Sequence, residues 1–136
     1  MVFAHRAFLN SIIRINDIDV REGIPDRNTE GTTQPKEMIL ITQGFKELQL
    51  VMTDYVGIVR TNMRLQRASR RLDLLHEETE DLYRHTVLSP QLCELRNMIT
   101  VSYLVVKGAQ FRTESRGLHY NTDHPYKSKL VQDIVL

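Results

Sequence analysis

Two long apolar repeats constrain the fold of this chain more than any other feature. In each repeat, apolar or small residues recur at alternating intervals of three and four, which places them along one side of an α-helix. The members of the first repeat are Leu65, Ala68, Leu72, Leu75, Thr79 and Leu82. The members of the second repeat are Leu92, Leu95, Ile99, Ser102, Val106 and Ala109. Between them, Ser89 and Pro90 are typical of an N-cap and a first helical position, so a short turn joins two antiparallel helices.

A third helix completes the predicted bundle. Leu48, Met52 and Tyr55 follow helical spacing, and Gly57 is expected to end or bend that helix, because glycine costs about 1 kcal/mol relative to alanine. The sequence therefore predicts an all-α fold, a three-helix antiparallel bundle with helices at about 44–56, 60–87 and 90–115. Further apolar residues widen the buried face of the last helix, which predicts that it is the most central one. They are Met98, Val101 and Val105.

The segments outside the bundle differ from it in composition. Residues 2–16 have helical apolar spacing and predict an extra N-terminal helix, which starts without a capping residue and is expected to be cut from a longer chain. Residues 22–43 are predicted to be a linker, since their first part is rich in Gly, Pro and Thr. Within them, the apolar run 38–42 is either a short extended segment or the lead-in to a helix. The tail, residues 117–136, lacks a helical repeat and is predicted to be irregular.

Composition narrows the class of protein. The 136 residues are 41% hydrophobic and 26% charged with a net charge of +1, as in a single globular domain. No apolar run approaches the roughly 20 residues of a membrane span, and the N-terminus lacks a signal-peptide pattern. The single cysteine, Cys93, allows no internal disulfide, which fits a reducing compartment. We therefore expect a cytoplasmic protein that does not bind membranes.

The charges of the second predicted helix run against its dipole. Acidic residues fill its second half and arginines its start, whereas the dipole favours the opposite order. The arginines are Arg60, Arg64, Arg67, Arg70 and Arg71. They form either a solvated face or a surface that a partner compensates, and nucleic acid is disfavoured because no aromatic residues lie between them. Antiparallel packing places Glu114 level with Arg60 and Arg64, which predicts a salt bridge there.

No combination of residues predicts chemistry within this chain. His119, Asp123 and His124 are close in sequence, but zinc sites usually recruit three or four ligands at recurring spacing, and no HxxxH or CxxC is present. Cys93 lies on an apolar helix and is expected to be a small buried residue. Neither a glycine-rich phosphate loop nor a set of nucleophile, base and oxyanion hole occurs. The chain alone is therefore predicted to have no catalytic, cofactor-binding or metal site.

Two stretches of the sequence resemble a known family. They are "DYVGIVRTNMRLQRASRRL" (residues 54–72) and "ELRNMITVSYLVVKGAQFRTESRGLHYNTDHP" (residues 94–125). Both resemble the C-terminal region of the L-aspartate oxidase family of flavoenzymes, which is related to the flavoproteins of succinate dehydrogenase and fumarate reductase. The element "ESRG-x-H" is shared with those relatives, whereas "DYVGIVR" and "RGLHY" favour the aspartate oxidase branch. The sequence departs from the family pattern at Thr53, where an aromatic residue is frequent, and at His124, in a turn that usually reads DYP.

The resemblance implies the activity of a longer parent chain. That activity is the FAD-dependent oxidation of L-aspartate to iminoaspartate in de novo NAD (quinolinate) biosynthesis, with oxygen or fumarate as the electron acceptor and quinolinate synthase as the next enzyme. Residues 1–21, which include "VFAHRA", resemble the end of the flavin-binding domain, residues 22–43 would be a linker, and residues 44–136 a helical domain. The longer parent chain would bind FAD, and the 136 residues of this chain would contribute no residue to the FAD site.

By the same resemblance, the helical domain packs against the flavin-binding and capping domains. The residues expected at this contact are Arg60, Arg64, Glu114, Arg116, His119 and Tyr120. In isolation, residues 114–125 are then expected to be partly disordered or covered by a neighbouring molecule in a crystal. Exposed apolar surface on the N-terminal helix predicts some self-association. Two alternatives stay open: a freestanding helical interaction module, and part of a fumarate reductase or succinate dehydrogenase flavoprotein.

Overall fold

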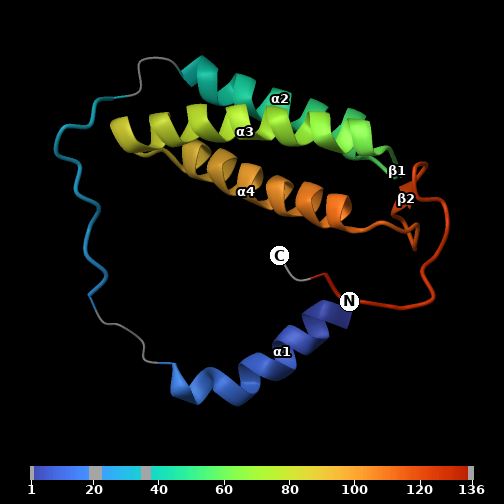
Figure 1. Ribbon diagram of the computed structural model, residues 1–136. Helices are drawn as coiled ribbons and strands as arrows, with labels where there is room; N and C mark the ends of the chain where they lie inside the picture. The colour runs from blue at the N-terminus through green and yellow to red at the C-terminus, as the bar shows by residue number, and fades with distance from the viewer. Residues whose placement is uncertain (1, 19–22, 35–37, 135–136) are drawn as a thin grey trace.

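The computed structural model describes residues 2–18, 23–34 and 38–134, and its main body is the predicted antiparallel three-helix bundle (Figure 1). The helices are α1 (Val2–Arg14), α2 (Met38–Val56), α3 (Asn62–His85) and α4 (Pro90–Phe111), with the 3₁₀ turn η1 (Ile15–Asp17) after α1. A two-stranded sheet, β1 (Val59–Arg60) and β2 (Tyr120–Asn121), closes one end of the bundle. The prediction of an all-α fold is confirmed, and the sheet is a small addition to it.

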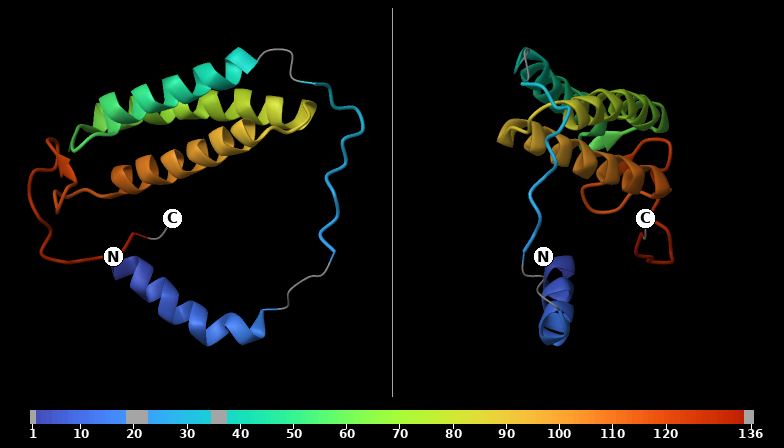
Figure 2. Two further views of the ribbon diagram at one scale, coloured as in Figure 1. Left: turned by 180° about the vertical axis from the view of Figure 1, so that it is seen from behind. Right: turned by 90° about the vertical axis from the view of Figure 1, so that its left-hand side faces the viewer.

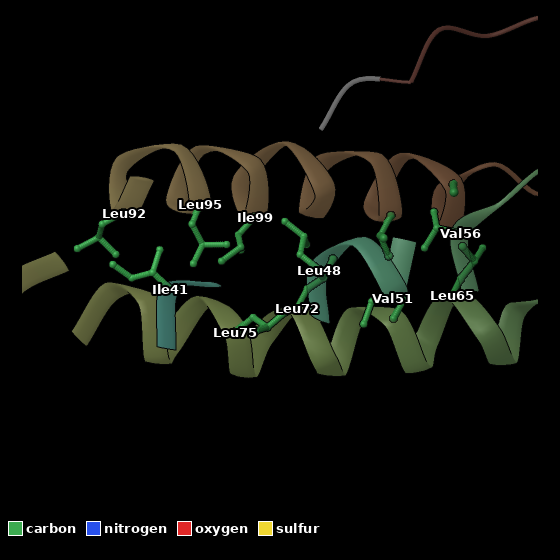
Figure 3. Packing of buried hydrophobic residues seen from close by; sticks show 13 residues of the cluster. Ile41, Leu48, Val51, Val56, Leu65, Leu72, Leu75, Leu92, Leu95 and Ile99 are labelled. Atoms are coloured by element: carbon green, nitrogen blue, oxygen red, sulfur yellow. The ribbon is translucent and has the colours of Figure 1, made fainter. Parts of the chain in front are cut away.

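The two apolar repeats form the core between α2, α3 and α4 (Figure 3). Leu65, Leu72, Leu92 and Leu95 are each at most 1% exposed, and Ile99 lies among them. Burying a leucine side chain contributes about 1.5–3 kcal/mol relative to leaving it in water, so these residues supply much of the stability of the bundle. The residues that follow helical spacing in the sequence are therefore the ones buried in the core.

The ends of the helices follow local capping chemistry. The Thr61 hydroxyl accepts a hydrogen bond from Arg64 N at 3.1 Å, and the Ser89 hydroxyl accepts one from Leu92 N at 3.2 Å, so both caps satisfy free N–H groups at a helix start. The apolar run 38–42 is the lead-in to α2 rather than an extended segment. The helix α4 ends at Phe111, earlier than predicted, because Arg112 adopts an extended backbone conformation.

Part of the predicted linker is anchored to the turn between α3 and α4. The Thr33 N–H donates to the His85 carbonyl and the Val87 N–H donates to the Thr33 carbonyl, each at 3.0 Å. Arg27 donates to the Tyr83 carbonyl, and its guanidinium lies over the Tyr83 ring, 4.9 Å from the centroid. The guanidinium of Arg96 also lies over this ring, at 4.5 Å. We call Arg27, Tyr83 and Arg96 the Tyr83 clamp; it makes residues 27–33 part of the folded unit.

The prediction that α4 is the most central helix is wrong in this chain. Of the residues that widen its apolar face, Val101 is 60% exposed and Val105 43% exposed, and the neighbouring Leu104 is 50% exposed. It is α3 that lies against both other helices most extensively. One side of α4 is thus apolar and uncovered.

The helix α1 lies apart from the bundle, on the side of α4 (Figures 1 and 2). Its large apolar residues are exposed, including Phe3 at 67% and Ile13 at 76%. A surface ion pair from Arg6 Nη1 to Asp133 Oδ2, 3.2 Å long, connects it to the C-terminal tail. Among the described residues, no helix combines the length and the apolar character that crossing a membrane requires.

Candidate functional site

The segment after α4 folds back onto the turn between α2 and α3. The strands β1 and β2 are parallel, with Tyr120 N donating to Ile58 O at 3.3 Å and Thr122 N donating to Arg60 O at 2.9 Å. A tight turn precedes β2, and Gly117 has a φ of +60° in it, a conformation that side-chain-bearing residues rarely adopt. This turn brings His119 next to Arg60.

Glu114 is the centre of an ion-pair cluster, but not the predicted one. Its carboxylate accepts hydrogen bonds from Arg112 Nη1 at 2.9 Å and from Arg116 Nε at 3.1 Å, and from the backbone N–H of Ser128 at 2.9 Å. The predicted salt bridge to Arg60 and Arg64 is therefore wrong. Because α4 ends at Phe111, the helical register that placed Glu114 beside those arginines no longer applies. The hydrogen bonds from Arg116 and Ser128 lower the pKa of Glu114 to about 2.

Arg60 pairs with His119 instead. Arg60 Nη1 lies 2.7 Å from His119 Nδ1, and Arg60 Nε donates to the Gly57 carbonyl at 2.7 Å. Because the guanidinium can only donate, Nδ1 must accept, and the proton of the neutral ring is on Nε2. That Nε2 atom is buried and has no hydrogen-bond partner among the described residues. Burial, followed by the positive charges of Arg60 and Arg112, lowers the pKa of His119.

A polar network ties the loop to the start of α3. Asn121 is 1% exposed; its Nδ2 donates to Asn62 Oδ1 at 2.9 Å, and its Oδ1 accepts from Asp123 N at 3.0 Å. The Ser115 hydroxyl accepts from Asn121 N at 2.9 Å and donates to the His124 carbonyl at 2.7 Å. Asp123 Oδ2 accepts from Asn62 N at 2.7 Å, which places a negative charge at the positive end of the α3 dipole. The loop therefore helps to cap the helix.

The expectation that residues 114–125 are partly disordered is wrong. The chain's own hydrogen bonds hold this stretch, and Glu114 and Ser115 are each 7% exposed. Of the other predicted contact residues, Arg64 is exposed and Tyr120 is 43% exposed. Leu118, at the tip of the turn, is 79% exposed. A contact with another domain at this loop stays a prediction, and these exposed side chains are the ones available for it.

Sequence reasoning missed Asn62, Ser115 and Asn121, which organise the loop. Asn and Ser often form hydrogen bonds to the backbone in turns and helix caps, so the composition of the stretch indicated an ordered turn. It did not indicate which groups these side chains would bond to. No group of three or more potential metal ligands gathers in the described parts of the chain. Asp123 and His124 each bond to Asn62, whereas the ring of His119 faces Arg60.

In the described parts of the chain, the starts of α3 and α4 and the arginines next to the loop are engaged by the chain's own groups rather than left free for the phosphates of a dinucleotide. Phosphate groups bind to free N–H groups at helix starts, but the chain's own side chains already satisfy such groups at the starts of α3 and α4. The arginines next to the loop are also occupied, by Glu114 and by backbone carbonyls and His119.

Comparison with known proteins identifies the family. The family model described as "Fumarate reductase flavoprotein C-term" matches residues 45–130, which include most of the bundle and the loop. The chain belongs to this family. It is 39% identical to L-aspartate oxidase of Pseudomonas aeruginosa over 135 residues, covering 99% of this chain and 25% of that protein. It is 40% identical to L-aspartate oxidase of Vibrio cholerae over 125 residues, covering 92% of this chain and 23% of that protein.

A solved structure gives the same picture of the fold. The structure of Mycobacterium smegmatis Sdh1 in complex with UQ1 matches with a TM-score of 0.55 and 28% identity, covering 89% of this chain and 19% of that chain. The resemblance to L-aspartate oxidases in the sequence is thus confirmed at the level of the family. The chain spans about a quarter of the length of the curated relatives it matches.

Proposed function

We propose that this chain is the C-terminal helical domain of an L-aspartate oxidase. The parent enzyme would use FAD to oxidise L-aspartate to iminoaspartate in de novo NAD biosynthesis, and quinolinate synthase would consume the product in the cytoplasm. The observation that carries the proposal is the match to L-aspartate oxidases at about 40% identity over nearly the whole chain. The lower identity of 28% to the Mycobacterium Sdh1 structure favours the aspartate oxidase branch over the succinate dehydrogenase branch.

The role of the domain would be structural. Residues 1–21 would end the flavin-binding domain, the residues before α2 would link it to the bundle, and the bundle with its tail would pack against the flavin-binding and capping domains. The predicted linker, residues 22–43, overlaps the start of the bundle, because α2 begins at Met38. The exposed apolar residues of α1 support this division, since a helix with Phe3, Phe8 and Ile13 in water needs a partner. The loop at residues 114–125 would offer Leu118 and Tyr120 to the same body, while Glu114 and Asn121 keep the loop rigid.

The experiment compares this chain with the longer parent chain. We expect the purified parent to show flavin absorbance and to turn over L-aspartate, and the chain of 136 residues to be colourless and inactive. Hydrogen peroxide release measures the reaction with oxygen, and fumarate reduction measures the alternative acceptor. Turnover of L-aspartate by the short chain alone would show that the division of roles is wrong.

A freestanding interaction module is the second candidate, because α1 and α4 both expose apolar side chains that a second copy could cover. This candidate predicts a stable dimer of defined size. Light scattering at several concentrations separates a defined dimer from weak, open-ended association. A defined dimer of the 136-residue chain that forms without any further segment would favour the module.

A further inference from the structure

One side of α4 has the character of an interface that this chain leaves uncovered. Met98, Val101 and Val105 recur at intervals of three and four, and Leu104 lies beside them; we call these four residues the α4 outer face. Val101 is 60% exposed and Leu104 is 50% exposed, although both belong to a helix whose opposite side is fully buried in the core. A groove lined by Pro90, Cys93, Asn97 and Val101, among others, runs along this side.

The exposed side of α3 shows what a solvated helix looks like in the same molecule. It carries mostly charged residues; its exposed large apolar residues are Leu74, at 54% exposure, and Met63, at 68% exposure in the first turn. The charged residues are Arg64, Arg67, Arg70, Arg71, Asp73, Glu77, Glu78, Asp81 and Arg84. An isolated exposed leucine is ordinary on a protein surface, whereas a continuous apolar stripe is typical of a contact. The bundle is therefore asymmetric, with α3 toward water and α4 toward a partner.

Two observations indicate which partner. The relatives are about four times as long as this chain, so in such a protein a body larger than the bundle must lie next to it. The helix α1 and the C-terminal tail both lie on the α4 side of the bundle (Figures 1 and 2), and Arg6 of α1 pairs with Asp133 of the tail. The chain therefore approaches the bundle from the side that carries the uncovered apolar stripe.

We infer that the α4 outer face is the surface against which the flavin-binding part of the parent chain packs. This inference rests on the proposed function and adds the specific surface to it. The contact is apolar and is centred on Val101, and the charged face of α3 stays in solvent in the parent as in the isolated chain.

Thiol labelling tests the inference. In a Cys93→Ala background, Val101→Cys places a thiol on the α4 outer face, and Leu74→Cys places the matched control on α3. Both side chains are more than half exposed in this chain, so a maleimide should label both thiols rapidly here. In the longer parent chain, we expect labelling at position 101 to be at least roughly tenfold slower, because access controls the reaction rate of a thiol. Labelling at position 74 should stay the same in both chains.

Each outcome has a separate meaning. Equal labelling of the two positions in the parent would overturn the inference. Labelling at position 101 that slows with increasing concentration of the short chain, yet stays fast in the parent, would assign the face to a second copy and also overturn it. Protection at position 101 in a parent that carries no flavin would mean that the surface is covered but that the proposed function is wrong.

Discussion

Glu114 is the residue on which the loop after α4 depends. Its carboxylate joins Arg112, Arg116 and the backbone of Ser128, so one side chain connects the end of the helix to the tail. A carboxylate that accepts several hydrogen bonds is much better stabilised in the fold than in the unfolded chain. The lowered pKa of Glu114 is the measure of that difference.

Acid should therefore weaken the fold through Glu114. The folded-state pKa is about 2 and the ordinary value is 4.5, so the stabilisation is present above pH 4.5 and is lost as the pH falls toward 2. We expect Glu114→Gln to be less stable than the wild type at pH 7 and to lose less stability between pH 4.5 and pH 2. Urea unfolding at a series of pH values measures this. The exposed Glu94→Gln is the control, and equal pH dependence of wild type and Glu114→Gln would contradict the assignment.

At the scale of the helices, the two apolar repeats determine how the helices pack. Gly44 determines how closely α2 approaches α4. A Cβ atom on Gly44 of α2 would lie 2.8 Å from Cδ2 of Leu95 of α4, whereas a Cβ on Gly108 would meet nothing within 4 Å. Since Leu95 is only 1% exposed, its methyl group has little room to move. Gly44 is thus a contact point of α2 with α4, and Gly108 is not.

The two glycines should respond differently to the same substitution. Gly108→Ala is expected to raise the free energy of unfolding by about 0.5–1 kcal/mol, because alanine loses less conformational entropy in a helix than glycine does. Gly44→Ala has the same helical advantage but must displace Leu95, so its gain should be smaller or reversed. Chemical unfolding of both variants gives the comparison. An equal gain from Gly44→Ala would mean that the helices are not in close contact there.

Predictability from the sequence differs between the repeats and the loop. The two repeats that contain Leu65, Leu72 and Leu95 follow the spacing of a helix, which is a local property of the chain. The bundle and its antiparallel order could therefore be predicted from the sequence. The partner of Arg60 could not, because it depends on where α4 ends and on how the turn at Gly117 returns the chain. Likewise, nothing in the spacing of Val101 and Val105 distinguishes burial within the chain from burial against a partner.

At the scale of the whole molecule, the Tyr83 clamp links the bundle to the segment that precedes it. The bundle holds the chain from Arg27 onward rather than only from the start of α2. The anchored residues cross the turn between α3 and α4, at the opposite end of these helices from the loop (Figure 1). These contacts fix where residues 27–33 lie against the end of α3.

Removal of the Tyr83 ring should loosen the attachment of residues 27–33 to the bundle. We expect Tyr83→Leu to speed amide hydrogen exchange at Thr33 and Val87 by roughly two- to fivefold, which corresponds to about 0.5–1 kcal/mol for the lost Arg27 contact. Tyr103→Leu is the matched control, since it removes a comparable contact with Lys107, 5.0 Å from the ring centroid, on α4. Exchange measured by NMR checks both. Unchanged exchange in Tyr83→Leu would show that the backbone pairing of Thr33 alone holds residues 27–33 to the bundle.

The capping of α3 by Asp123 also sets an order of events during synthesis. A ribosome releases α2 and α3 long before residues 119–124, which supply His119 to Arg60 and Asp123 to Asn62. A nascent chain that stops after α4 therefore has its core leucines but one unfinished end, at which Arg60 and the first N–H of α3 lack these partners. The last stage of synthesis therefore completes the start of α3, and a chain that ends before the loop keeps the Thr61 cap but leaves this helix end with fewer contacts and more exposed to solvent.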